Sequence, residues 1–284
     1  GKTFVIALPG EAICHTNFTH IIHDIALLNS LGMRIVLVHG ARPQLEQRLE
    51  QQQLTLQYAD HTPITDSQAM ECVKDAVGSA RISIESLLSM GLANSPMHGA
   101  RIRVVGGNFI TAKPFGIREG IDFQYSGEVR KIDRTGIQSQ LDDAAIVLLS
   151  SVGYSPTGEA FNLGYEDVAT QAAITLGAEK LIFLGADAGL NDGKGSLLKS
   201  INLSQAQQML EELKDPAIFG PLQGAYQACL SGVPRCHLIS YKADGALLGE
   251  LFTRDGVGTL VLQHGEEVIR QASIDDITGI LDLI

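Results

Sequence analysis

The start of the chain carries a strand–helix–strand pattern, and this pattern constrains the fold more than any other feature. A short apolar run at residues 4–8 predicts a buried strand, which Pro9 ends. Apolar residues at helical spacing between residues 21 and 28 predict a helix, and residues 34–39 predict a second buried strand. Parallel strands need a crossover of about this length, so the segments predict a right-handed βαβ unit.

The same alternation continues along the chain. Residues 69–88 carry a long apolar stripe typical of a helix, and Gly and Pro breaks between residues 101 and 131 predict hairpins at the edge of a mixed sheet. Further patterns predict a strand at 145–149, a helix at 167–176, a strand at 181–184, a glycine-rich loop at 187–195, a helix at 222–230 and a strand at 235–240. We therefore expect an α/β fold, three-layered and doubly wound on a mainly parallel sheet, with a weak lobe boundary near residue 178.

Polar residues in front of the predicted helices indicate their N-terminal caps. The first helix follows Thr16 and Asn17, either of which fits the cap position. The pairs Thr65 with Gln68 and Ser204 with Gln207 have the spacing of a capping box.

Charge and cysteine usage exclude several classes of protein. The 32 acidic and 21 basic side chains give a formal net charge of −11, which repels a nucleic-acid backbone. The four cysteines are far apart and the histidines show no metal spacing, so we expect neither a metal site nor disulfides. No apolar stretch is long enough for a membrane span, and the first residues lack a signal peptide pattern. A cytoplasmic protein without nucleic-acid or membrane partners is the expectation.

Ligands of an open parallel sheet bind beyond the carboxyl ends of its strands. The loops in this position are Pro9-Gly10, residues 39–41 and residues 153–158. Taken singly, each is better explained as an ordinary strand-to-helix turn that needs glycine for backbone reasons. The chain has neither a dinucleotide-binding glycine motif nor a phosphate loop with its lysine. Pattern analysis alone thus stops at an α/β protein with glycine loops at its strand ends.

Segments spread along nearly the whole chain match the motifs of one family. They are FVIALPGEAI at 4–13, IVLVHGARPQ at 35–44, PITDSQAMECVK at 63–74, GNFITAKPFG at 107–116, FNLGYEDVATQAA at 161–173 and HLISYKADGALLGELFTRDGVGT at 237–259. The chain resembles the amino-acid kinase family, in particular acetylglutamate kinases and the kinase-like half of bacterial N-acetylglutamate synthases. The resemblance implies an amino-acid kinase-type fold over residues 1–266.

The resemblance also marks positions where kinase chemistry has been lost. Superposition of the motifs places Ala7 and Pro221 where active kinases carry lysines, and Pro63 where an arginine holds the substrate carboxylate. Phosphoryl transfer depends on positioned positive charge, so we expect no catalytic residue here and no kinase activity. The kinase-type positions, retained or degenerate, are Ala7, Pro9, Gly10, Gly40, Pro63, Asn162, Glu166 and Pro221. An active kinase and a ligand-free oligomerisation scaffold are the alternatives.

The last motif implies an L-arginine site. In arginine-sensitive relatives the residue matching Glu250 binds the guanidinium, and the neighbouring site positions fall on His237, Gly256 and Gly258. Without the resemblance, Glu250 is better explained as a solvated or capping residue, since the local apolar residues Leu247, Leu248, Leu251 and Phe252 account for core packing. We expect Glu250→Gln to weaken arginine binding and to leave stability almost unchanged.

Residues 267–284 resemble the first strand and helix of a GNAT-type acetyltransferase domain, cut short. The resemblance therefore implies a piece of a longer N-acetylglutamate synthase, in which a C-terminal acetyltransferase domain uses acetyl-CoA. It implies no cofactor in this chain, and a homo-oligomer as the state of assembly.

Overall fold

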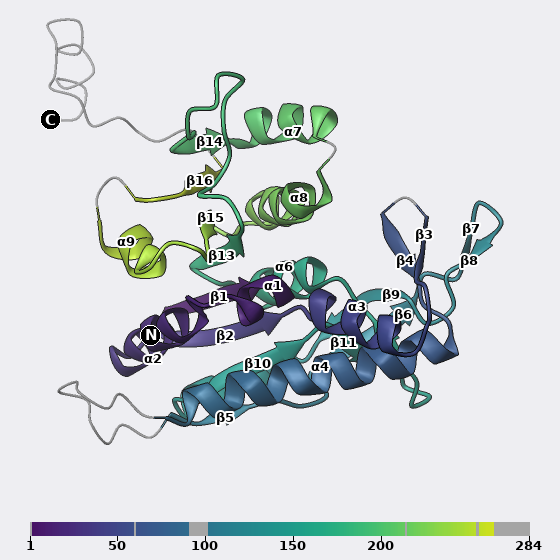
Figure 1. The fold of residues 1–284 in the computed structure, drawn as a ribbon. Helices are drawn as coiled ribbons and strands as arrows, with labels where there is room; N and C mark the ends of the chain where they lie inside the picture. Colours follow the sequence, from purple (N-terminus) through teal and green to yellow (C-terminus); the bar gives the residue numbers. More distant parts are fainter. Residues whose placement is uncertain (1, 60, 91–101, 214, 254–255, 264–284) are drawn as a thin grey trace, which may run out of the picture.

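A mainly parallel sheet forms the middle layer of the molecule (Figure 1). The computed structural model describes residues 2–59, 61–90, 102–213, 215–253 and 256–263. Its eight-stranded sheet has, in spatial order, β14 (Ser200–Asn202), β16 (Thr259–Leu262), β15 (Arg235–Ser240), β13 (Lys180–Gly185), β1 (Thr3–Leu8), β2 (Arg34–His39), β10 (Ile146–Ser150) and β5 (Val104–Val105). The strands from β15 to β5 are parallel, while β16 runs antiparallel to β15.

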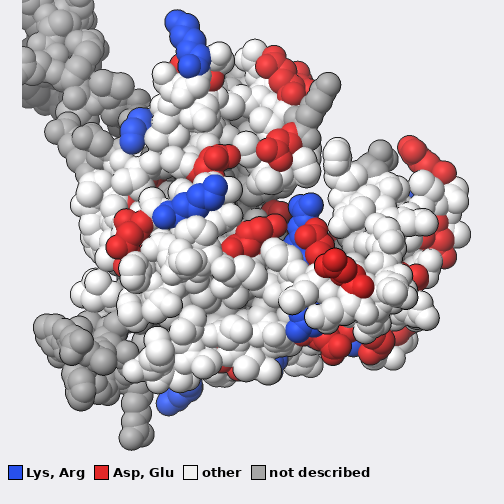
Figure 2. Space-filling model, in the orientation of Figure 1, with Lys and Arg blue, Asp and Glu red and all other residues white. Residues whose placement is uncertain are grey.

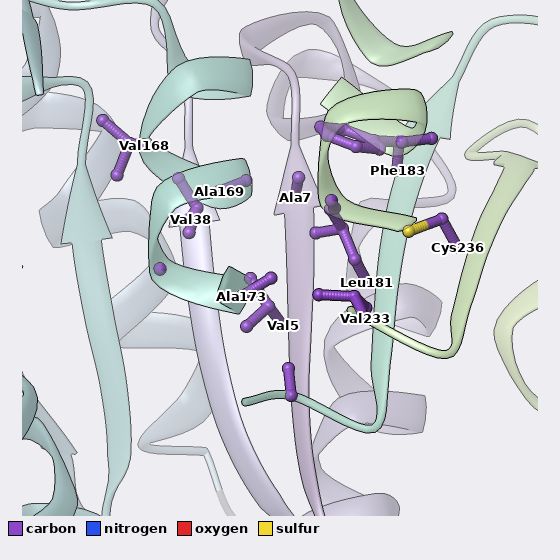
Figure 3. Packing of buried hydrophobic residues seen from close by; sticks show 14 of the residues in the cluster. Val5, Ala7, Val38, Val168, Ala169, Ala173, Leu181, Phe183, Val233 and Cys236 are labelled. Carbon is purple, nitrogen blue, oxygen red and sulfur yellow. The ribbon is translucent and has the colours of Figure 1, made fainter. Parts of the chain in front are cut away.

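Both faces of this sheet are buried, because successive side chains of each strand enter opposite cores. In β1, Val5 and Ala7 belong to one apolar cluster, and Ile6 and Leu8 belong to the other. Helices α6 (Tyr165–Leu176) and α8 (Pro216–Leu230) cover the first face, as Figure 3 shows for α6 against β1 and β2. Helices α2 (Phe18–Ser30) and α4 (Ser67–Leu88) cover the second. The predicted three-layer α/β fold is confirmed.

The hairpin region corrects one expectation. Its strands β6 (Ile110–Pro114) and β9 (Gly127–Ile132) are antiparallel as predicted, but they belong to a separate four-stranded sheet with β11 (Val152–Tyr154) and β12 (Ala160–Asn162). Only β5 joins the main sheet, parallel to β10. The second sheet forms where the chain leaves β10, since β11 begins directly after Ser151. Two-stranded ribbons complete the strands: β3 (Gln57–Ala59) with β4 (Thr62–Ile64), and β7 (Ile117–Arg118) with β8 (Ile121–Asp122).

The predicted capping boxes are wrong by one or two residues. Helix α4 is capped by Asp66, which accepts a hydrogen bond from Ala69 N, because the hydroxyl of Thr65 is engaged with Ser126 Oγ at 2.7 Å. The capping box before α7 (Leu203–Glu212) joins Asn202 and Gln205. Asn17 does precede α2, but its side-chain amide donates to the carbonyls of Tyr241 and Ala243 and caps nothing.

Helix α8 begins at Pro216, earlier than the predicted residue 222. Asp215 caps it by accepting a hydrogen bond from Ala217 N. Pro216 occupies the first turn, where a backbone N–H would have no partner within the helix, so proline is tolerated there. Pro221 therefore lies inside the helix. In the described part of the chain, the remaining helices are α1 (Gly10–Cys14), α3 (Arg42–Gln51), α5 (Arg134–Asp142) and α9 (Ala246–Phe252).

The lobe boundary near residue 178 falls in the link between α6 and β13, and it stays a prediction. One apolar cluster contains residues from both sides of it, including Leu149 and Leu238. The predicted acetyltransferase-like segment 267–284 lies outside the described residues. Within the described part of the chain, every helix is too short or too polar to cross a membrane.

Candidate functional site

A cavity of about 510 Å³ opens at the carboxyl ends of the central parallel strands. The residues that follow β1, β2 and β13 line it, in agreement with the rule that ligands bind at this edge of an open α/β sheet. Most of the kinase-type positions named from the sequence meet here: Pro9, Gly10, Gly40, Pro63, Asn162 and Glu166.

Gly10 allows the walls of the cavity to come together. A Cβ atom at this position would lie 2.7 Å from the backbone nitrogen of Arg42 and 2.7 Å from Pro43 Cδ. Any side chain would therefore separate the N-termini of α1 and α3. The glycine retained from the family motif is explained by this close approach of two helix ends.

His39 has a structural role at the neighbouring strand end. The ring is fully buried, and its hydrogen bonds join Nε2 to Ser150 Oγ at 2.8 Å and Nδ1 to the carbonyl of Gly40 at 3.0 Å. Burial lowers the pKa of His39 to about 4, so the ring is neutral: Nδ1–H donates to the carbonyl, and Ser150 donates to Nε2. These bonds fix the turn at Gly40.

The charged groups in the cavity are acidic on balance. Its lining includes the carboxylates of Glu11 and Glu166 and the guanidinium of Arg42. Burial raises the pKa of Glu166 to about 7; the charge of Glu11 adds to this rise, and that of Arg42 opposes it. Among the described residues, Glu11 and Glu166 form no ion pair, while Arg42 donates to Glu46 at 3.1 Å.

The positions where lysines were expected in an active kinase lie outside this lining. Ala7 is fully buried in the cluster between β1 and α6, near Val38 and Ala169 in Figure 3. Pro221 is buried within α8. Both places are apolar core, so the chain offers no ammonium group there.

The loop at 153–158 does not line the cavity, in contrast to the other two strand-end loops named from the sequence. Gly153 lies within β11, which forms a hairpin with β12 in the second sheet. The chain after β10 continues directly into that hairpin, and only Ser151 at the junction lines the cavity.

A second cluster brings together His237, Glu250, Gly256 and Gly258, the predicted arginine-site residues. Helix α9 presents Ala246, Leu247 and Glu250 to the interior, at helical spacing. Glu250 Oε1 lies 2.7 Å from His237 Nδ1 of β15. Its Oε2 accepts hydrogen bonds from the backbone amides of Val257 at 2.6 Å and Gly258 at 2.8 Å.

These contacts set the protonation of the pair. Burial raises the pKa of Glu250, but the hydrogen bonds from His237, Gly258 and Val257 outweigh it and hold the pKa at about 2. Burial lowers the pKa of His237, and the nearby Lys180 acts in the same direction. An ionised Glu250 therefore accepts from the Nδ1–H of a neutral His237, whose Nε2 accepts from Lys180 Nζ at 3.3 Å.

The interpretation of Glu250 as a solvated or capping residue is wrong, because its side chain is only 4% exposed. Phe252, assigned to the core from its spacing, is 58% exposed. The helix is thus rotated so that the carboxylate, and not the phenyl ring, faces β15. Gly258 permits this packing, since a Cβ there would lie 2.2 Å from the carbonyl of Leu238.

Sequence patterns missed several residues of both sites. Arg42 and Tyr165 line the cavity, and Lys180 and Lys199 border the Glu250 cluster. Lys180 is placed by the register of β13 with β15, because it pairs with Arg235 and thus lies diagonal to His237. Of these residues, Arg42 could have been found from the sequence, because it directly follows the strand-end pair Gly40-Ala41. In the described ranges of the chain, His, Cys, Asp and Glu side chains form no group suited to a metal ion.

Acidic and basic side chains are interspersed on the face drawn in Figure 2, without an extended basic surface among the described residues. The doubly wound sheet and the cavity at the carboxyl ends of its strands are typical of α/β proteins that bind small molecules. Residues 2–240 match the model of the Amino acid kinase family, and the chain belongs to this family. The resemblance inferred from the sequence motifs is confirmed.

More specific likenesses are to longer proteins. An amino-acid acetyltransferase of Azotobacter vinelandii is 57% identical over 282 residues, which cover 99% of this chain and 65% of that relative. An N-acetylglutamate synthase from Neisseria gonorrhoeae, complexed with coenzyme A and L-arginine, superimposes with a TM-score of 0.87 at 33% identity, over 100% of this chain and 66% of that one. The chain thus spans about two thirds of the length of these relatives.

Carbamate kinase from Giardia lamblia bound to AMP-PNP superimposes with a TM-score of 0.68 over 93% of this chain and 99% of that chain. At 16% identity this likeness shows a shared fold.

Proposed function

We propose that the chain is the amino-acid kinase-like domain of an N-acetylglutamate synthase, which binds L-arginine as an effector and does not transfer phosphate. The observation that carries the proposal is the buried Glu250–His237 cluster, in a chain similar over its whole length to a synthase complexed with L-arginine. The relatives named amino-acid acetyltransferase support the same assignment.

The charges of the strand-end cavity argue against phosphoryl transfer. A transferring phosphoryl group needs positive charge around its oxygens. Here the lysine positions are held by the buried Ala7 and Pro221, and the cavity contains the carboxylates of Glu11 and Glu166. Glu166 also lies in the first turn of α6, so the chain's own carboxylate occupies the helix end that would attract an anion.

The Glu250 cluster supplies groups suited to a guanidinium. A carboxylate and backbone carbonyls both accept from its planar set of N–H donors. The carbonyl of Gly256 already accepts from Lys199 Nζ at 3.2 Å, so this carbonyl lies where a cationic donor reaches it. In the proposed complex the arginine guanidinium replaces the lysine ammonium, while Glu250 holds the carbonyl-bearing segment in place through Val257 and Gly258.

Calorimetry with L-arginine, together with a coupled kinase assay, tests the proposal. We expect saturable heat with L-arginine, a higher unfolding temperature in its presence, and no acyl phosphate formed from ATP and N-acetylglutamate. Turnover in the kinase assay would favour the active kinase. The absence of both heat and a thermal shift would favour the ligand-free scaffold.

The assignment extends to a complete enzyme that transfers the acetyl group of acetyl-CoA to L-glutamate through a C-terminal acetyltransferase domain, and that assembles as a homo-oligomer. Its test is the effect of L-arginine on the initial rate of N-acetylglutamate formation by the full-length enzyme, with light scattering to give the oligomeric state. A rate independent of L-arginine would contradict the effector role, and a monomer would contradict the assembly.

A further inference from the structure

The cavity at the strand ends is open although apolar residues occupy the positions where active kinases carry lysines. Its volume of about 510 Å³ lies in the range typical of small-molecule sites. The chain maintains it with specific packing, including the contact that only glycine allows at position 10. A collapsed remnant would have filled this space with side chains.

The lining of the cavity combines features that favour a cation. Glu11 and Glu166 line it, and neither forms an ion pair within the described residues. Aromatic rings, whose faces attract ammonium groups, also line it: Tyr58, Tyr165 and Tyr241. A nucleotide would bring several negative charges against these carboxylates. Arg42 also lines the cavity, but its guanidinium already donates to Glu46.

Aliphatic side chains also line the cavity. Leu45 of α3 and Val73, Ala76 and Val77 of α4 lie along it, together with Leu56 before β3. A lining that combines carboxylates, aromatic rings and aliphatic side chains matches a ligand with a cationic end and a hydrocarbon body. We propose that this cavity binds a small aliphatic amine, a class that includes the basic amino acids, with its ammonium group on Glu11 and Glu166.

The protonation of Glu166 gives this site a characteristic pH dependence. The groups that act on it are Glu11 of α1, Arg42 of α3, and Tyr165 and Asp167 of its own helix, while α8 presents Gly220 to it. With its pKa raised to about 7, Glu166 is largely neutral at pH 6 and ionised at pH 8. Amine binding therefore strengthens as the pH rises through about 7, with release of a proton.

Titration calorimetry of the 284-residue protein with cadaverine and with L-lysine tests the site. At pH 8 both amines bind the parent, and Glu11→Gln and Glu166→Gln each weaken binding by about tenfold or more. Glu166→Gln also removes the gain in affinity between pH 6 and pH 8. The matched control Glu212→Gln, at the exposed end of α7, binds as the parent does, and ATP with Mg²⁺ binds more weakly than either amine.

Several results would overturn the inference: no amine binding by the parent, unchanged affinity in both Gln variants, or tighter binding of ATP than of the amines. Circular dichroism establishes that each variant is folded, and if Glu166→Gln is not, Glu11→Gln decides. Glu250→Gln separates this site from the proposed arginine site, because it leaves cadaverine binding unchanged. If L-arginine binding is lost in Glu166→Gln and kept in Glu250→Gln, the arginine assignment fails and the cavity site stands.

Discussion

Hydrogen bonds from His237, Val257 and Gly258 converge on the carboxylate of Glu250, and they explain how a charged side chain is tolerated beside β15. An isolated buried carboxylate is strongly unfavourable, whereas one that accepts several donors retains its charge. The hydrogen bonds also connect α9 to the chain that enters β16. Glu250 is thus part of the structure of the domain, whether or not it contacts a ligand.

Replacement of Glu250 by Gln tests this role directly. The neutral amide keeps the shape of the side chain but cannot offer charged acceptors to both backbone amides, and a hydrogen bond to a charged group contributes about 1.5–3 kcal/mol. We expect Glu250→Gln to lower the free energy of unfolding by about that amount, contrary to the expectation from the sequence. Because the segment that bears the Gly256 carbonyl is then held less firmly, we also expect L-arginine binding to weaken by about one to two orders of magnitude.

Urea denaturation measures the free energy of unfolding. Titration calorimetry measures L-arginine affinity, at a temperature well below unfolding so that the variant is folded. The exposed Glu212→Gln serves as the control and leaves both quantities unchanged. A parent-like unfolding free energy for Glu250→Gln would mean that the hydrogen bonds of its carboxylate do not contribute. A parent-like arginine affinity would remove Glu250 from the proposed site.

At the scale of elements, the contact between β1 and α6 bears on the proposed absence of kinase chemistry. Small residues allow the helix to lie close to the strand: Ala7 on β1, and Ala169 and Ala173 on α6 (Figure 3). A lysine at position 7 would have to place a flexible amine in this apolar layer.

We expect Ala7→Lys to lower the free energy of unfolding by about 2–4 kcal/mol and to leave kinase activity undetectable. Pro63 and Pro221 still leave substrate and phosphate without their basic partners in this variant. Chemical denaturation and the coupled kinase assay measure the outcome, with Ala243→Lys as the exposed control. A stable variant with turnover would show that the lysine reaches the cavity and that the other positions are dispensable.

Strands and helices differ in how far their sequences define them. Apolar runs identify β1, β2, β10, β13 and β15, because strands buried on both faces need continuous apolar residues. Helix caps were misplaced because polar side chains such as Thr65 and Asn17 bond to distant parts of the chain. The separate sheet of β6, β9, β11 and β12 was missed because β6 pairs with the distant strand β11, and such pairing leaves no local pattern.

For the molecule as a whole, topology determines which residues meet. The parallel order of β13, β1, β2 and β10 brings their carboxyl ends together, and the strand-end residues Pro9, Gly10 and Gly40 were identified on that rule. The tyrosines of the cavity come from unrelated elements, so their convergence could not be read from spacing. The grouping of His237 and Glu250 was predictable from one uninterrupted motif, but its link to Lys180 depends on strand register.

The titration of Glu166 also affects the stability of the whole fold. Its pKa is about 7 in the folded protein, against an ordinary value of 4.5. Between these values the folded state binds the proton more tightly than the unfolded state does, so the contribution of Glu166 is fully present below about pH 4.5 and is lost as the pH rises through 7. Glu250 acts in the opposite sense, because its lowered pKa stabilises the fold above pH 4.5 and that contribution is lost toward pH 2.

Comparison of the parent with Glu166→Gln isolates the first effect, since the other groups with shifted pKa values, such as Glu250 and His39, are the same in both proteins. Relative to the parent, we expect the unfolding free energy of the variant to rise by about 1–2 kcal/mol between pH 5 and pH 8. The full pKa shift corresponds to a larger change, but Glu166 lines an open cavity and is partly solvated, so we expect less. Urea denaturation at several pH values measures the difference. An equal dependence of unfolding free energy on pH in the two proteins would show that Glu166 titrates normally. A bound amine abolishes the difference at pH 8, because it stabilises the ionised carboxylate, which only the parent has.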